Sequence, residues 1–216
     1  MIHSCSEKSS KTARTLLKSM ENDSNAHRLL NDRVGFRLYA AEHHLNRLKE
    51  IRELYGNIAE EHARIAVEME IDCFLSQAIG AVDSLLYQIN TVFDLGVPDN
   101  HFSIHAIQSG LSAKTKYIAL LNELDNARKP GNWYSILNEL RNQSMHRTFL
   151  KKVIVAHAYS EEPPRIKFLR IQKDIDGNPL EYEMNEEIIP YLESSLEKVS
   201  TLIHGIRKNA PLLQIA

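Results

Sequence analysis

The sequence predicts a mainly α-helical protein: an antiparallel helical bundle with a small antiparallel β-sheet inserted before the last helix. Two observations lead to this prediction. Apolar residues recur at spacings of three and four along several long segments, which is typical of amphipathic helices. Between residues 151 and 185 the pattern changes to alternation with β-branched residues, which is typical of strands. Helices joined by short breaks pack most simply as an antiparallel bundle.

The first half of the chain predicts two long helices. Residues 1–26 are polar and form a tail or a frayed helix in this interpretation. Apolar periodicity then predicts a helix from Arg28 to Tyr55, which Gly56 ends, and a second helix from Ile58 to Leu95. The inward stripe of the second helix is expected to comprise Ile65, Met69, Phe74, Ala78, Val82, Leu85, Ile89 and Val92, and that of the first to include Leu45, Leu48, Ile51 and Leu54.

Shorter helices are expected in the middle of the chain. Asp99 or Asn100 can cap one helix ending at Ser109, and Ser112 can cap another that runs to about Ala127. A further helix starts near Asn132, and its inward face is expected to comprise Trp133, Ile136, Leu137, Leu140 and Ser144.

Three strands and a last helix complete the expected fold. The strands are predicted at Val153–Tyr159, Ile166–Gln172 and Leu180–Met184, and the helix at Glu186–Lys208, where Pro190 fits only in the first turn. We therefore expect one helical domain over residues 27–209, including the β insertion at 151–185, and a C-terminal tail at 210–216.

Several classes of protein are excluded by composition. The apolar runs are short and interrupted by charge, and no hydrophobic signal segment follows the N-terminus, so we expect a cytoplasmic protein without a membrane partner. The two cysteines, Cys5 in the polar tail and Cys73 inside an apolar stripe, fit neither a metal motif nor a disulfide framework. Glycine-rich phosphate-binding motifs are also absent from the sequence.

The strongest candidate for chemistry is the segment from Arg141 to Arg147 in the late helix. Asn142 and His146 are four residues apart and share a helix face, so the amide can orient the imidazole. Arg141 and His146 are five apart and point about 140° away from each other on a regular helix. Both can act on one phosphate only if a second copy supplies the missing group across a two-fold axis.

Charge is unevenly distributed along the chain. Between Arg141 and Lys173 there are eight basic and two acidic residues, so this stretch carries +6 and the rest carries −8. A positive field beside Arg141 would attract a polyanion, and we expect Arg147, Lys151 and Lys152 to contact it. The alternative is that these lysines and arginines are merely the solvated faces of strands.

The motif resembles that of the HEPN superfamily, whose helical bundles carry an Arg, four to six intervening residues and a His in a late helix. Arg141 and His146 match this spacing, Asn142 matches the polar residue after the Arg, and the helix with Ala81 and Asp83 looks like the core helix of that family. The resemblance covers about residues 30–206. It implies a homodimeric, metal-independent endoribonuclease without cofactors that leaves 2′,3′-cyclic phosphates, of a toxin or antiphage defence system, with a nucleotidyltransferase-type antitoxin as a further partner.

Other interpretations remain open at this point. A catalytically inactive module of the same lineage would bind RNA, a nucleotide or a protein, and a purely structural helix end would pair Arg141 with a carboxylate. Arg37 with His43 or His44 also satisfies the loose spacing, but lies in the first long helix. His101 and His105 could share a metal ion, although no third ligand is spaced to join them.

Overall fold

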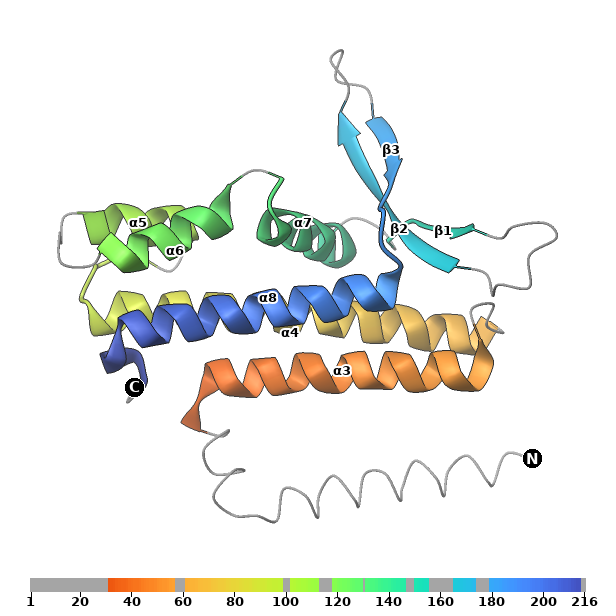
Figure 1. The fold of residues 1–216 in the computed structure, drawn as a ribbon, viewed down its shortest axis with the longest axis horizontal. Helices are drawn as coiled ribbons and strands as arrows, with labels where there is room; N and C mark the ends of the chain where they lie inside the picture. The colour runs from red at the N-terminus through yellow and green to blue at the C-terminus, as the bar shows by residue number, and fades with distance from the viewer. Residues whose placement is uncertain are drawn as a thin grey trace.

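The computed structural model describes residues 31–56, 61–98, 102–112, 118–129, 131–146, 150–155, 165–173 and 179–214. Three long helices, α3 (Arg33–Tyr55), α4 (Glu61–Val92) and α8 (Ile188–Asn209), lie side by side and contact one another (Figure 1). The shorter helices lie against this layer: α5 (Ile104–Ser112), α6 (Ile118–Arg128) and α7 (Trp133–His146). The prediction of a mainly helical bundle is confirmed.

A small three-stranded antiparallel sheet lies between α7 and α8, as predicted. Its strands are β1 (Lys152–Val155), β2 (Arg165–Lys173) and β3 (Pro179–Glu183), in the order β1-β2-β3. Residues 156–159 of the predicted first strand lie outside the described residues. The sheet joins the bundle through Phe168 of β2, which is fully buried and packs edge-on against Tyr191 at the start of α8. Figure 1 shows the sheet standing beyond the end of α7.

The ends of α3 and α7 follow from short-range hydrogen bonds. The Asp32 side chain accepts a hydrogen bond from the backbone N–H of Val34, so α3 begins at Arg33 rather than near Arg28. Gly56 ends the same helix with a φ of 69°, a left-handed value that glycine adopts without strain. The Asn132 side chain accepts a hydrogen bond from the N–H of Trp133, which confirms the predicted start of α7.

Two predicted helix caps need revision. Ser103 caps α5, because its hydroxyl accepts a hydrogen bond from the N–H of Ala106, whereas Asp99 and Asn100 lie outside the described residues. Ser112 is the last residue of α5 and not the cap of the next helix. Its hydroxyl donates a hydrogen bond to the carbonyl of Ser109 instead.

Most of the predicted core is confirmed, but three residues were assigned wrongly. Ile65 and Met69 are 55% and 61% exposed, and Leu54 in the last turn of α3 is 74% exposed. Met69 lies two residues before the fully buried Ile71, and Cys73 two residues after it, so both point about 160° away from it around the helix. The predicted core positions that are buried are Leu45, Leu48, Ile51, Phe74, Ala78, Val82, Leu85, Ile89, Leu137 and Leu140.

The chain end packs on the bundle instead of forming a tail from residue 210. Ala210 and Leu213 are buried, and the 3-10 helix η3 (Pro211–Gln214) contacts α4 and α8. The predicted helical domain therefore extends at least four residues further. Among the described helices, none is both long and apolar enough to cross a membrane.

Candidate functional site

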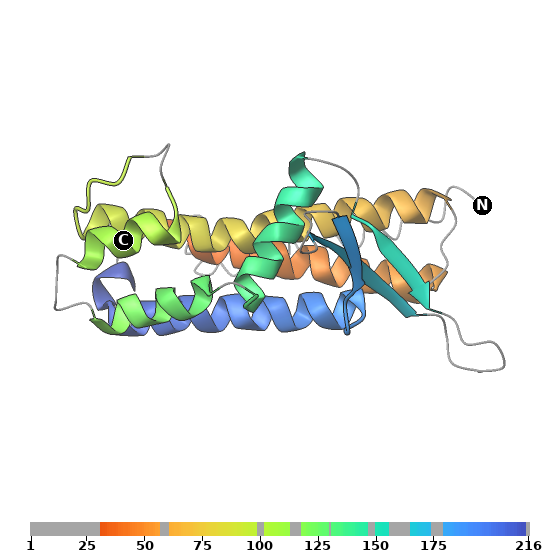
Figure 2. The same ribbon diagram turned by 90° about the horizontal axis from the view of Figure 1, so that it is seen from above.

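Helix α7, which carries the predicted motif, is fixed across the bundle by its apolar side. Figure 2 shows α7 running across α8 and α4, with its C-terminal end lying beyond α4 on the side away from α8. Leu137 and Leu140 are fully buried, and the Ser144 hydroxyl donates a hydrogen bond to the Asp72 carboxylate of α4. These contacts set the position of Arg141 and of the last helical turn.

Arg141 is half-buried and makes no ion pair among the described residues. Its Nη2 donates to the Asn138 amide oxygen at 3.0 Å, while its buried Nε has no hydrogen-bond partner in the described part of the chain. Arg141 acts electrostatically on Asp83 of α4 and on the buried Tyr134 phenol. The guanidinium therefore faces the α4 side of the bundle.

The other two predicted catalytic residues lie in the last turn of α7. Asn142 is exposed, and its backbone position is one turn from His146, the final residue of the helix. The side chain of His146, together with Arg147, lies outside the described residues. Gln143 is buried and its Nε2 has no partner among the described residues, so it is a polar group that the sequence did not single out.

The predicted basic stretch is largely compensated by acidic residues from elsewhere in the chain. Lys151 is exposed, but Lys152 forms an ion pair with Glu68, a residue 84 positions earlier in α4. Other basic residues of the stretch form ion pairs in the same way: Arg165 with Glu187, Lys167 with Glu183, and Arg170 with Glu139. The local charge of +6 therefore overstates the positive field that an approaching anion meets.

A hollow of about 470 Å³ opens between α3 and α4, and we call it the basic hollow. Its lining comprises Arg33, Arg37, Gly80, Asp83, Ser84, Tyr87, Gln88 and Phe102. The Arg37 side chain lies across Gly80, where a Cβ atom would meet Nη1 at 2.8 Å. Its Nη1 donates to the neutral Gln77 amide at 3.0 Å, and its Nε is buried with no partner among the described residues.

The electrostatics of the basic hollow connect it to α7. Burial lowers the pKa of Arg37 and the neighbouring Arg33 lowers it further, whereas Asp83 opposes both effects. Water reaches Asp83, yet the surrounding walls desolvate its carboxyl and raise its pKa, against the opposing influence of Arg141 and Arg37. Asp83 is therefore within electrostatic reach of both the arginine of α7 and the arginine of α3.

In the sequence, Arg37 stands out only as half of a competing motif with His43 or His44. His44 instead binds Glu70 of α4 through Nδ1 at 2.7 Å. Two sequence signals could have revealed the basic hollow: the one-turn spacing of Arg33 and Arg37, and the isolated Gly80 inside a helical pattern.

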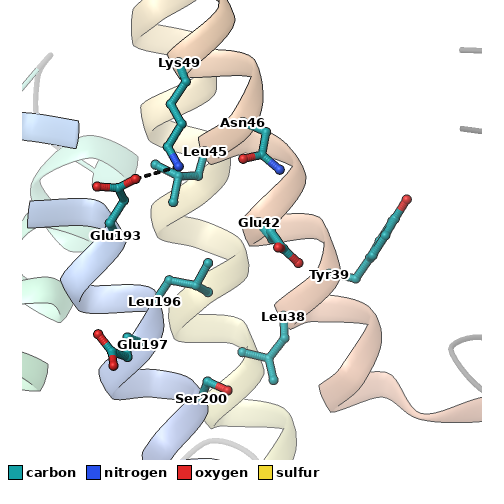
Figure 3. A pocket seen from close by; sticks show the side chains of 10 residues that line it. All are labelled: Leu38, Tyr39, Glu42, Leu45, Asn46, Lys49, Glu193, Leu196, Glu197 and Ser200. Carbon is teal, nitrogen blue, oxygen red and sulfur yellow. Dashed lines mark ion pairs between the residues drawn. The ribbon is translucent and has the colours of Figure 1, made fainter. Parts of the chain in front are cut away.

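A second hollow of about 450 Å³ lies between α3 and α8, and we call it the acidic groove (Figure 3). Glu42, Glu193 and Glu197 line it, and Lys49 is the one cation among its described lining residues, paired with Glu193 at 2.6 Å. The apolar part of the lining comprises Leu38, Leu45 and Leu196. A surplus of negative charge makes this groove unsuitable for RNA.

Metal ligation finds no support in the described residues. They contain no group of three or more His, Cys, Asp or Glu side chains placed to hold an ion. His105 is exposed on α5, and its predicted companion His101 lies outside the described residues.

No family model matches the chain, no curated protein matches it, and no solved structure matches it.

Proposed function

We propose that the protein is a metal-independent endoribonuclease of HEPN type that works as a homodimer. The observation that supports this most is the state of Arg141: half-buried on a firmly anchored helix, with an unpartnered Nε and no ion pair among the described residues. Asn142 is exposed beside it, one helical turn from His146. A cation held in place without a carboxylate partner is suited to a phosphate.

The chemistry needs two proton transfers and one charge stabiliser. A general base removes the proton of the 2′-hydroxyl, and the oxygen forms a bond to phosphorus. As the bond to the 5′-oxygen breaks, a general acid protonates that leaving oxygen, and a 2′,3′-cyclic phosphate remains. His146 from each of two copies supplies the base and the acid, Asn142 orients the imidazole, and Arg141 stabilises the charge on the phosphorane.

The surface beside the end of α7 supports association of two copies. Ile65, Met69 and Met145 are each more than half exposed, and Cys73 is exposed on the same side of α4 as Met69. The hydrogen bond from Ser144 to Asp72 holds Met145 close to this helix. Exposed apolar side chains along one side of α4 and at the adjoining end of α7 favour a protein interface, and a two-fold axis here would bring two α7 ends together.

Cleavage is tested with purified protein, structured and unstructured RNA, and EDTA in the buffer. We expect products with 2′,3′-cyclic ends from the wild type, and none from His146→Ala with an unchanged melting temperature. The matched control is His204→Ala, which removes an exposed histidine of α8 and should leave cleavage intact. Cleavage that survives in His146→Ala would show that the proposed chemistry is wrong.

The dimer is tested by analytical ultracentrifugation. The wild type should sediment as a dimer, and Met69→Lys together with Met145→Lys should shift it to a monomer and abolish cleavage. If two imidazoles share one cleft, an excess of the His146→Ala protein should also suppress wild-type activity through mixed dimers. A wild type that stays monomeric at every concentration would remove this mechanism.

A second candidate function is RNA binding without cleavage. The observation that favours it is that Arg141 acts on Asp83 of its own molecule and that Lys152 is already neutralised by Glu68. In that case fluorescence anisotropy should detect RNA binding that weakens in Arg141→Ala, while no product forms even after long incubation.

A further inference from the structure

The acidic groove is an elongated surface between the antiparallel helices α3 and α8. Leu38 and Ser200 line one end of it, and Lys49 and Glu193 line the other (Figure 3). At a rise of 1.5 Å per residue, the stretch of α3 from Leu38 to Lys49 is about 16 Å long. A further helix of about three turns therefore matches the length of the groove.

The floor of the groove is apolar and its two rims are acidic. Leu38 and Leu196 are partly buried and lie between the two helices in Figure 3. Glu42 on α3 and Glu197 on α8 are both exposed, and neither forms an ion pair with a described residue. The described lining contains three glutamates and one lysine, so its net charge is −2. A ligand that suits this surface presents apolar side chains together with positive charge.

Residues 1–30 lie outside the described part of the chain, but their sequence contains a segment with these properties. From Ala13, apolar residues recur at spacings of three, four and seven, namely at Leu16, Leu17 and Met20, which is one face of a helix. Arg14 borders this face, about 60° from Leu17. Residues 8–20 carry no acidic side chain and four cations, Lys8, Lys11, Arg14 and Lys18.

The connection to α3 is long enough for this segment to reach the groove of its own chain. Because α3 begins at Arg33, the groove starts at Leu38 only about 8 Å along the helix. Residues 21–30 join Met20 to the first described residue, and ten extended residues span about 33 Å. The segment can therefore fold back along α3. Attachment to the same chain gives it an effective concentration in the millimolar range, which favours it over a free partner.

We propose that residues 8–20 form an amphipathic helix that binds the acidic groove of the same molecule. Leu16, Leu17 and Met20 cover the apolar floor, while the long side chains of the cations reach the acidic rims. A basic amphipathic helix of another protein can then enter the groove only by displacing this segment. The proposal goes beyond the ribonuclease function and does not rest on it, since no residue of α7 lines the groove.

Hydrogen–deuterium exchange of the full chain, followed by mass spectrometry, tests whether the segment packs. A helix of 13 residues is marginal in water by itself, so slow amide exchange at residues 8–20 requires a binding surface. Leu16→Asp should speed this exchange at least tenfold. Its matched control is Thr15→Asp, which adds the same charge about 150° from the middle of the apolar face and should leave the exchange unchanged.

Substitutions in the groove identify the surface. Glu42→Lys together with Glu197→Lys should speed exchange at residues 8–20 at least fivefold, because both rims then repel the cations of the segment. Both glutamates are exposed, so the melting temperature should not change. The control is Glu53→Lys together with Glu186→Lys, which reverses two exposed glutamates outside the groove lining and should have no effect on the exchange.

A fluorescent peptide of residues 5–24 measures whether the groove is already occupied. Fluorescence anisotropy should show that this peptide binds the full-length Leu16→Asp protein at least tenfold more tightly than the wild type, because the segment of the wild type fills its own groove. A peptide that itself carries Leu16→Asp is the control and should bind neither protein.

Four outcomes overturn the proposal. Equally fast exchange at residues 8–20 in the wild type and in Leu16→Asp would show that the segment does not pack. Slow exchange that persists after reversal of Glu42 and Glu197 would place it on another surface, and slow exchange that becomes fast on dilution would place it on a second copy. Equal binding of the peptide by both proteins would show that the wild-type groove is open. None of these measurements involves RNA, so this proposal and the ribonuclease proposal fail separately.

Discussion

The basic hollow and the acidic groove share helix α3 and have nearly the same volume, about 470 and 450 Å³, yet their charges are arranged in opposite ways. In the acidic groove the cation Lys49 is paired with Glu193. In the basic hollow the cation Arg37 is bound to the neutral amide of Gln77. A charged group that already forms an ion pair contributes little to binding a ligand. The two hollows therefore differ more in the ion pairing of their cations than in volume.

Their floors differ as well. The lining of the acidic groove includes Leu45, a core residue that is 3% exposed, whereas the basic hollow has Gly80 beneath Arg37. The first is therefore a seam where two helices bury their apolar faces, and in the second the Arg37 side chain packs directly on the helix backbone at Gly80. A substitution on the floor of the acidic groove should therefore lower stability, whereas a substitution at Gly80 should change stability little.

The largest expected effect is on the floor of the acidic groove. Leu45→Ala should lower the free energy of unfolding by about 2–5 kcal/mol, because it leaves a cavity in the core. Gly80→Ala should leave it unchanged or raise it by up to about 1 kcal/mol, since alanine favours the helix. Urea unfolding followed by circular dichroism measures both. Equal losses for the two variants would mean that the basic hollow is also a structural seam.

A smaller effect is expected at Arg207, which borders the basic hollow through Gln88 but, unlike Arg37, is paired. Its guanidinium donates to both oxygens of Asp32 at 2.9 and 2.7 Å. Asp32→Ala removes this pair and the cap of α3 and should cost about 1–3 kcal/mol. Asp32→Asn keeps a capping group and should cost about 1 kcal/mol.

The same pair predicts a pH dependence. The hydrogen bonds from Arg207 hold the pKa of Asp32 below its usual value. A lowered pKa in the folded state means that the stabilisation is fully present above about pH 4, the value of an unfolded aspartate. It is lost as the pH falls through the lowered pKa. The stability gap between wild type and Asp32→Asn should therefore close on acidification, and a gap that stays constant would contradict the assignment.

The ion pair across the acidic groove should matter less. Lys49 and Glu193 side chains are 37% and 46% exposed, and exposed pairs contribute below about 1 kcal/mol. Lys49→Ala should therefore shift the urea midpoint only slightly. A loss of stability as large as that of Leu45→Ala would contradict this expectation.

The smallest effect is expected at Asp83 in the basic hollow. Its raised pKa means that the folded state disfavours the ionised carboxylate, so ionisation costs stability as the pH rises above the unfolded value. Asp83→Asn should be equally or slightly more stable at pH 7, and the difference should vanish at acidic pH. Thermal unfolding at both pH values measures this. A clear loss of stability at pH 7 would indicate that Asp83 forms a stabilising pair with Arg37 or Arg141.

The order of elements was predictable because each follows from neighbours in the sequence. Periodicity predicted α3, α4, α7, α8 and the three strands, and Asn132 and Gly56 marked helix ends through their own backbone preferences. The errors arose where a local pattern was ambiguous. Ile65 and Met69 have the spacing of a buried stripe, but the face of a helix that is covered depends on which helices pack against it.

The candidate site was likewise predictable from the sequence only in part. Arg141, Asn142 and His146 were identified from their spacing together with the polar residue after the arginine and their place in a late helix, and their common location on α7 follows from that spacing. The basic hollow was missed, because Arg37, Gly80, Tyr87 and Phe102 come together only when α3 and α4 pack. Likewise, the excess charge between Arg141 and Lys173 is compensated by acids that the sequence places elsewhere.

By itself, the sequence determined the helices, the strands, their order and the residues that carry the motif, since these depend on interactions over one or two turns. Only the tertiary structure decided which cations are paired: Lys152 meets Glu68 across 84 residues and Arg207 meets Asp32 across 175, while Arg37 donates to the amide of Gln77. The physical reason is that a charge is neutralised by whatever lies within a few ångströms in space, and chain distance does not limit that choice.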